Sequence, residues 1–262
     1  MLVDVHCHLT HESLKNQIDD VIKRAKEKGV VAIIASGVNA PTNREVLELA
    51  KKYPDIVKCS LGLYPIDLLG LETDEVGLTR QIEKFDLDEE LEFIKKNKNK
   101  IVAVGESGLD YHWDFEHHEE QKRNFKEILA FVKKINKPVI VHSRKAEVDA
   151  INLLEQSGVK KVILHMFEGR KNLIKKAIDL GYYFTVPTNI LKSQHFQMLV
   201  SMVEMNKLLT ETDSPWMSPK PGSVNEPANV AESIKKIAEI KNLDAKEAEN
   251  IIYMNYQNVF KQ

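Results

Sequence analysis

Short apolar runs alternate with amphipathic helical patterns along this chain. Eight of the runs have the length and the β-branched content of buried strands. They are the run that ends at His6 and residues 30–35, 56–63, 101–106, 138–142, 162–165, 182–186 and 208–213. Gly29, Gly158 and Gly181 each stand between a helical pattern and the next run, where a helix C-cap is expected. This order predicts parallel strands that are joined by helices.

Eight such units in 262 residues match the strand number and the length of a (β/α)8 barrel, the TIM barrel. We therefore predict this α/β fold, with a doubly wound open sheet as the alternative. No repeat, low-complexity tract or linker divides the sequence, so residues 1–262 are expected to form a single domain. The first helical pattern runs from Leu14 to Ala25 and the last from Val230 to Ala238. The least regular segment, 66–99, is acidic and then basic, which is typical of a solvated loop and helix.

The charge balance limits what the protein binds. It has 37 Lys and Arg residues against 39 Asp and Glu residues. A protein that grips nucleic acid along many phosphates carries a strong basic excess, so we expect any contact with DNA to be local. No apolar run is long enough to span a membrane, and the acidic and histidine-bearing start of the chain excludes a secretory leader. Cys7 and Cys59 are expected as reduced thiols, which indicates a cytoplasmic location. The sequence leaves the oligomeric state open.

Histidines and carboxylates follow several predicted strands at their C-terminal ends. Each of them alone is explained as well by a structural role, and Asp213 by a cap before Pro215. In a barrel, however, the C-terminal ends of all strands meet on one face, where active sites of this fold lie. His6 and His8 point to the same side because side chains alternate along a strand. The groups expected to meet on this face are His6, His8, Glu106, His142, His165 and Asp213. Since no lysine at these positions neutralises them, the sequence predicts a metal centre.

Six ligands exceed the three or four that one catalytic ion takes from a protein. Two divalent ions about 3.5–4 Å apart, bridged by a carboxylate and a water, use the whole set. We expect the first two histidines to bind one ion and the last two to bind the other, with Glu106 bridging. Asp213 is placed to bind metal and to accept a proton from the bridging water. Such ligands suit Zn, Mn, Co or Fe, and also Mg through the carboxylates, so the sequence leaves the metal open.

Seven motifs in this order resemble the TatD family of metal-dependent hydrolases, whose barrels are of the amidohydrolase type. The motifs cover residues 4–9, 62–65, 105–111, 142–144, 165–169, 211–215 and 225–227. The resemblance implies that the same six residues hold two metal ions. It also implies hydrolysis of phosphodiester bonds in DNA, by an exonuclease or another deoxyribonuclease.

Two positions depart from the pattern of that family. The histidine of its Gly-x-His-Pro motif is Tyr64 here, and the basic residues that often precede Asn-Glu-Pro are absent before Asn225. We predict that Arg144 contacts a substrate phosphate at the mouth of the barrel. Tyr64, His112 and Phe167 are the other predicted substrate contacts, through a hydroxyl or by stacking on a base. A salt bridge at Arg144 and ordinary packing of the rings are the alternatives.

The residues and the resemblance together predict a metal-dependent phosphodiesterase or deoxyribonuclease that acts on DNA or on a small phosphodiester. Single-stranded DNA is expected ahead of duplex. A hydroxide bound by both ions is expected to attack, with Glu106 and Asp213 as the catalytic residues and Asp213 as general base and then proton donor. The first alternative is an amidohydrolase or lactonase acting on a small cyclic amide or ester. The second is a metal-dependent nucleic-acid-binding protein without turnover.

Overall fold

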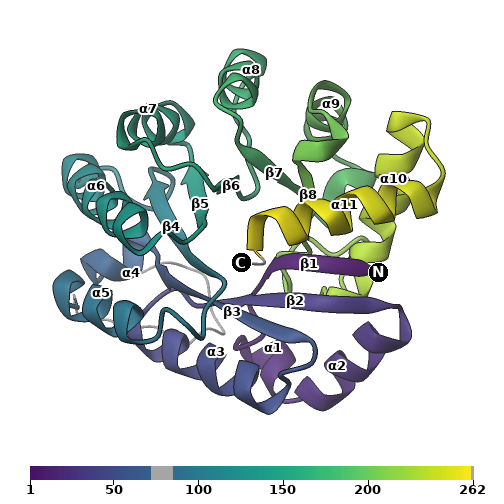
Figure 1. The fold of residues 1–262 in the computed structure, drawn as a ribbon, viewed down its shortest axis with the longest axis horizontal. Coiled ribbons are helices and arrows are strands. Elements are labelled where there is room, and N and C mark those ends of the chain that lie inside the picture. Colours follow the sequence, from purple (N-terminus) through teal and green to yellow (C-terminus); the bar gives the residue numbers. More distant parts are fainter. Residues whose placement is uncertain (72–84, 261–262) are drawn as a thin grey trace.

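Eight parallel strands form one sheet, in which each strand is hydrogen-bonded to the next one along the chain (Figure 1). The computed structural model describes residues 1–71 and 85–260. The sequential strand order confirms the predicted (β/α)8 barrel, because a doubly wound sheet reverses its order at a switch point. The strands are β1 (Leu2–Cys7), β2 (Val30–Ser36), β3 (Val57–Leu63), β4 (Ala103–Asp110), β5 (Val139–Arg144), β6 (Val162–Leu164), β7 (Tyr183–Val186) and β8 (Leu208–Thr210).

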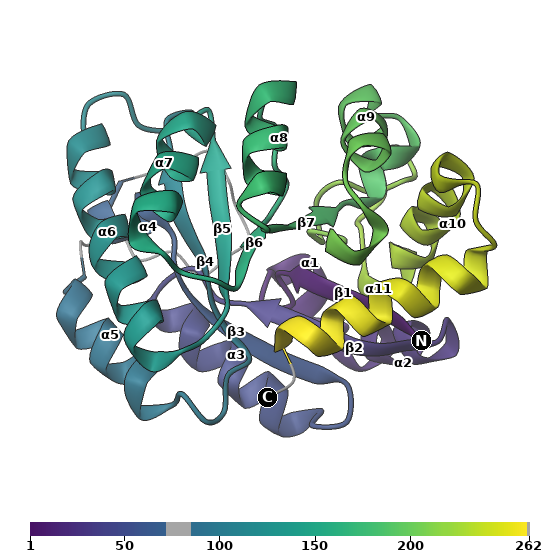
Figure 2. The same cartoon turned by 45° about the horizontal axis from the view of Figure 1, so that its top comes forward.

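Helices surround the strands (Figure 2). They are α1 (Glu12–Lys15), α2 (Ile18–Glu27), α3 (Ala40–Lys52), α4 (Pro65–Leu69), α5 (Leu87–Lys96), α6 (His118–Ile135), α7 (Glu147–Ser157), α8 (Lys171–Asp179), α9 (Gln194–Met202), α10 (Val230–Lys241) and α11 (Ala245–Phe260), with the 3-10 helices η1 (Thr188–Leu191), η2 (Met205–Lys207) and η3 (Pro227–Asn229). The helical patterns face inward: α6 buries Phe125, Ile128, Leu129 and Val132 against the strands. Within the described ranges, no helix combines the length and the apolar character needed to cross a membrane.

The first and last strands are joined at a seam. The hydroxyl of Thr210 donates to the carbonyl of Val3 at 2.7 Å, and the backbone N–H of Asp213 donates to the carbonyl of His6 at 3.0 Å. The buried side chain of Asp4 accepts from the backbone N–H and the hydroxyl of Thr212, at 3.0 and 2.5 Å. These contacts hold the first strand beside the last strand and the segment that follows it.

Three helical segments differ from the sequence prediction. The pattern from Leu14 to Ala25 is divided between α1 and α2, because His11 caps a separate short helix by accepting from the N–H of Ser13. Helix α11 was not predicted, since its apolar pattern is interrupted by asparagines. Segment 66–99 contains the expected helix, α5, and differs from the prediction in also forming most of α4. Residues 72–84 of this segment lie outside the described residues.

Two strands differ from their predicted limits by three residues or more, whereas the others agree within two residues. Strand β8 ends at Thr210 rather than at residue 213, because the chain turns there and Asp213 has a φ of 51°. Strand β4 continues to Asp110, so Glu106 lies inside this strand rather than at its end. The registers of β4 with both neighbours shift between Val104 and Ser107. Such an irregularity changes the direction of a side chain within a strand.

One buried asparagine, Asn255, joins the last helix to the barrel, and its contribution to stability can be tested. Asn255 donates to the carbonyls of Met205 and Leu208 at 2.6 and 2.8 Å. Asn255→Ala leaves both carbonyls without this donor, so we expect the free energy of unfolding to fall by about 2–3 kcal/mol. Asn258→Ala, an exposed position of the same helix, is the matched control and should change it by less than about 0.5 kcal/mol. Equal urea midpoints for the two variants would contradict this role.

Candidate metal centre

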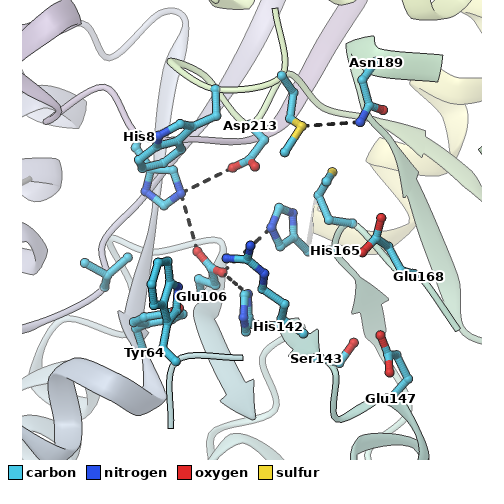
Figure 3. Close-up of a pocket in the computed structure, with 16 residues that line it drawn as sticks. His8, Tyr64, Glu106, His142, Ser143, Glu147, His165, Glu168, Asn189 and Asp213 are labelled. Atoms are coloured by element: carbon cyan, nitrogen blue, oxygen red, sulfur yellow. Dashed lines mark hydrogen bonds and ion pairs between the residues drawn. The ribbon is translucent and has the colours of Figure 1, made fainter. Parts of the chain in front are cut away.

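A pocket of about 470 Å³ opens at the C-terminal ends of the strands (Figure 3). Its size is within the usual range of small-molecule sites. Five of the six predicted metal ligands line it, and the sixth, His6, is fully buried beside them. The other lining residues are Val38, Tyr64, Trp113, Ser143, Arg144, Glu147, Met166, Glu168, Asn189, Trp216 and Met217.

Four of the predicted ligands surround one point. Nε2 of His6 and Nε2 of His8 lie 3.2 Å apart, and both lie 3.4 Å from Oε2 of Glu106. Both also lie 3.5 Å from Oδ1 of Asp213. A tetrahedral ion with bonds of about 2.0–2.1 Å needs ligand atoms about 3.3 Å apart. The donor atoms and their spacing therefore fit one divalent ion.

The second half of the site uses the other oxygen of Glu106. Nδ1 of His142 lies 2.6 Å from Oε1 of Glu106, and Nε2 of His165 lies 3.8 Å from it. Candidate ligand atoms of these three residues all lie within 4.8 Å of one another, and the same holds for His6, His165 and Asp213. The structure thus brings all six predicted ligands together, with Glu106 between the two histidine pairs.

Buried partners fix the orientation of three of the rings. The hydroxyl of Ser36 lies 3.1 Å from Nδ1 of His6, and Glu211 binds Nδ1 of His165 at 2.8 Å. Asp110 binds Nε2 of His142 at 2.9 Å, which turns Nδ1 of that ring towards Glu106. Such outer partners hold a histidine ligand in one tautomer and orientation. Sequence reasoning missed Asp110 and Glu211, although both are acidic residues in the quoted motifs.

The backbone around Asp213 is held from two sides. Asp213 has a left-handed φ, which is uncommon for a residue with a side chain. Asp4 holds the preceding residue, Thr212, from β1, and the side chain of Asn225 donates to the carbonyl of Thr212 at 2.8 Å. Arg24 in turn binds Glu226 through both carboxylate oxygens. The Asn-Glu-Pro motif therefore supports the loop that carries Asp213.

Comparison with known proteins identifies the family to which the chain belongs. A profile described as TatD related DNase matches residues 3–261. The chain belongs to the TatD family. Deoxyribonuclease TATDN3 of Homo sapiens is 34% identical over 264 residues, covering 99% of this chain and 93% of that protein. The uncharacterized metal-dependent hydrolase YabD of Bacillus subtilis is 30% identical over 267 residues, covering 100% of this chain and 99% of that protein. The crystal structure of YJJV, a TatD homolog from Escherichia coli, matches with a TM-score of 0.87 at 26% identity, covering 100% of this chain and 98% of that chain.

Membership of the TatD family confirms the prediction of a metal-dependent hydrolase. It agrees with the chemistry of the donor set in this chain, because clustered imidazole and carboxylate groups are the ligands of catalytic divalent ions.

The predicted substrate contacts are divided between the pocket and the rest of the molecule. Arg144 and Tyr64 line the pocket, with the Arg144 guanidinium 5.5 Å from the centre of the Trp113 ring. The hydroxyl of Tyr64 donates to Asp110 at 2.7 Å. His112 is not among the lining residues, and Phe167 is fully buried with its ring against another core phenylalanine. The structure therefore places two of the four predicted contacts at the pocket.

Tyr64 acts on the site through Asp110. Oδ2 of Asp110 accepts from Tyr64 and faces Nε2 of His142, so the tyrosine hydroxyl supports the orientation of a candidate metal ligand. Burial alone raises the pKa of Asp110, but the hydrogen bond and charge of His142 and the hydrogen bond of Tyr64 lower it to about 2. Two further aromatic residues, Trp113 and Trp216, also line the pocket.

Opposite charges compensate one another within the buried site. Burial alone lowers the pKa of the His8 and His142 imidazoles, but neighbouring carboxylates outweigh it and raise both pKa values to about 10. Burial raises the pKa of Glu106, but the charge and hydrogen bond of His142, with hydrogen bonds of His6 and His8, hold the pKa of that carboxyl well below its usual range. In the absence of metal, the site therefore holds carboxylates together with protonated imidazoles at neutral pH.

A metal ion has to displace those imidazole protons, so its affinity should depend on pH. Since the pKa values of His8 and His142 are raised to about 10, both groups hold protons throughout the range from pH 6 to pH 8. We expect Zn²⁺ affinity to rise with pH across this range, by about tenfold per pH unit for each proton displaced. Titration of the metal-free protein against a competing chelator measures it, and calorimetry in two buffers counts the released protons. Constant affinity without proton release would contradict the expected protonation.

Proposed function

We propose that this chain hydrolyses phosphodiester bonds of DNA, and that its six clustered ligands hold two divalent ions. The observation that carries the two-ion arrangement is the position of Glu106, whose Oε2 faces His6 and His8 while its Oε1 faces His142. The similarity to TATDN3 of Homo sapiens, which is named a deoxyribonuclease, favours DNA as the substrate. We place the protein in a reducing compartment, the cytoplasm, because Cys7 and Cys59 are buried free thiols.

The chain's own residues divide the work of the reaction. When bound, divalent ions activate water and polarise phosphoryl oxygens. Burial raises the pKa of Asp213, but the hydrogen bond of His8 and the charges of nearby histidines lower it, so the group is a carboxylate at neutral pH. An oxygen of Asp213 accepts the proton of the attacking water and later returns it to the leaving group. Arg144, beside Trp113 in the same pocket, binds a phosphate oxygen.

The shape of the site favours a single strand. The reacting groups lie in a pocket of about 470 Å³, and Glu106 and His165 are about 95% buried within it. A base-paired end presents two strands to this opening, whereas one strand end can enter alone. Zn, Mn, Co, Fe and Mg all suit the imidazole and carboxylate donor set.

A substrate screen tests the function. The metal-loaded protein is assayed against single-stranded DNA, a chromogenic phosphodiester, and a panel of cyclic amides and lactones. We expect cleavage of the first two, and Arg144→Ala should raise KM for DNA by about tenfold, the value of one charge-assisted hydrogen bond. Arg123→Ala, an exposed arginine of α6 outside the pocket, should leave KM unchanged. Turnover confined to the amides or lactones would replace this proposal with the amidohydrolase alternative.

The number of metal ions bound per chain tests the two-ion arrangement. Titration of the metal-free protein with Zn²⁺ or Mn²⁺ should reach saturation close to two equivalents. His165→Ala should lower that number, because it removes a candidate ligand whose ring nitrogens lie within 4.8 Å of ligand atoms of both Glu106 and Asp213. His117→Ala changes an exposed histidine that pairs with Asp114 and should keep two equivalents. A folded wild-type protein that takes up one equivalent or less would overturn the arrangement.

Replacing Asp213 separates proton transfer from metal binding. Asp213→Asn keeps the size of the side chain and one oxygen ligand, but the amide cannot accept the proton. We expect kcat to fall by about 10² to 10⁴-fold, the usual contribution of a general base, with the metals retained and KM changed far less. Glu106→Gln should instead lower the metal content, because a neutral amide bridges two cations poorly. Near-normal kcat in fully loaded Asp213→Asn would assign the proton to another group.

A further inference from the structure

One side of the pocket carries hydrogen-bond acceptors that have no partner. Glu147 begins α7 after β5, and Glu168 follows β6. Both line the pocket, and within the described residues neither takes part in a hydrogen bond or an ion pair. Asn189, from the segment after β7, has a buried Oδ1 without a hydrogen-bond partner, and Ser143 lies at the end of β5. We call Ser143, Glu147, Glu168 and Asn189 the acceptor side.

Figure 3 shows how this side is placed. Glu147 and Glu168 lie beside Ser143 and His165, whereas His8 and Tyr64 lie across the pocket from them. Three successive strand ends, those of β5, β6 and β7, therefore supply the acceptor side. Glu106 and His142 lie between this side and the wall that His8 and Tyr64 form (Figure 3).

The acceptor side also determines the charge of the pocket. Glu106 and Asp213 are compensated by the histidines around them. Among the remaining lining residues that the structure describes, Arg144 is the one cation, and Glu147 and Glu168 are two anions. In the proposed function, the single arginine binds the phosphate that reacts. A second phosphate group on this side would therefore lie beside two carboxylates without a cation to pair with. Unpaired acceptors instead favour groups that donate hydrogen bonds and carry no negative charge.

We infer that the acceptor side binds the terminal nucleoside of a DNA strand whose end carries no phosphate. This inference rests on the proposed function. A terminal nucleoside offers a sugar hydroxyl and, on most bases, an amino group as donors, and carboxylates accept well from such amino groups. The scissile phosphate then lies at the metal centre, and the rest of the strand leaves the pocket away from Glu147 and Glu168. The enzyme accordingly cuts from an unphosphorylated end and disfavours an end that carries a phosphate.

The test uses single-stranded oligonucleotides of one sequence that differ only in their ends. Each end carries either a hydroxyl or a phosphate, and kcat/KM for release of the terminal nucleotide is measured with the metal-loaded full chain. A phosphate at the attacked end should lower kcat/KM by about tenfold or more, the size expected for charge repulsion across a few ångströms of partly screened solvent. The combinations of ends identify which end enters the pocket.

Charge-neutral variants connect this preference to the two glutamates. Glu147→Gln and Glu168→Gln keep the size and one acceptor oxygen, so each should raise kcat/KM for the phosphate-ended strand by about threefold or more. Glu27→Gln makes the same charge change at the exposed end of α2, away from the pocket. It should leave kcat/KM unchanged for both kinds of oligonucleotide. Equal rates on both kinds of end, or a preference that the pocket variants leave unchanged, would overturn this inference alone. No cleavage of any oligonucleotide would overturn the proposed function as well.

Discussion

The buried side chain of Asp4 holds the first strand of the barrel against the segment that follows the last one. Its two oxygens accept both donors of Thr212, and the next residue, Asp213, donates its backbone N–H to His6. Two candidate ligands of one ion, His6 and Asp213, are therefore far apart in the sequence and meet through this seam. A barrel that stayed open between β1 and β8 would keep the ligands of β4, β5 and β6 but lose the four-atom group around Glu106.

The site is held together by alternating opposite charges. Glu211 contacts His165, and Asp110 contacts His142, which in turn contacts Glu106. Each group is costly to bury alone, because a buried charge without a partner loses its hydration and gains nothing in return. Removing one member therefore leaves its neighbour uncompensated as well as removing a ligand. The same partners keep the rings oriented before any ion binds, so the protein has little left to rearrange when one does.

The barrel and the clustering of the six candidate ligands could be predicted from sequence because both depend on local periodicity. A strand with His6 and His8 two residues apart places both rings on one side whatever the rest of the fold. Parallel order then brings Glu106, His142 and His165 to the same face. The outer partners were missed because a carboxylate such as Asp110 or Glu211 reveals its role only through a neighbouring strand.

Other predictions were wrong because they relied on a local pattern alone, such as the position of a residue after a strand or the spacing of apolar residues in a helix. Phe167 follows a strand end as a substrate contact would, but its ring turns into the core against Phe184. Helix α11 lacks an unbroken apolar stripe because Asn255 uses one of its buried positions to bind backbone carbonyls. A buried polar residue with satisfied hydrogen bonds is stable in a core. A prediction from hydrophobic periodicity, however, assigns such a residue to an exposed position.

The balanced charge of the chain is consistent with how the pocket handles a charged substrate. Lys and Arg number 37 against 39 Asp and Glu, so the protein has no net excess of positive charge to attract a polyanion. The attraction is concentrated instead where Arg144 and the metal ligands lie, and Glu147 and Glu168 oppose it on the adjacent side. In the proposed function, positive charge confined to one phosphate position would align a single phosphodiester with the reacting groups. A broad basic surface would hold the strand at many phosphates equally and select no position for cleavage.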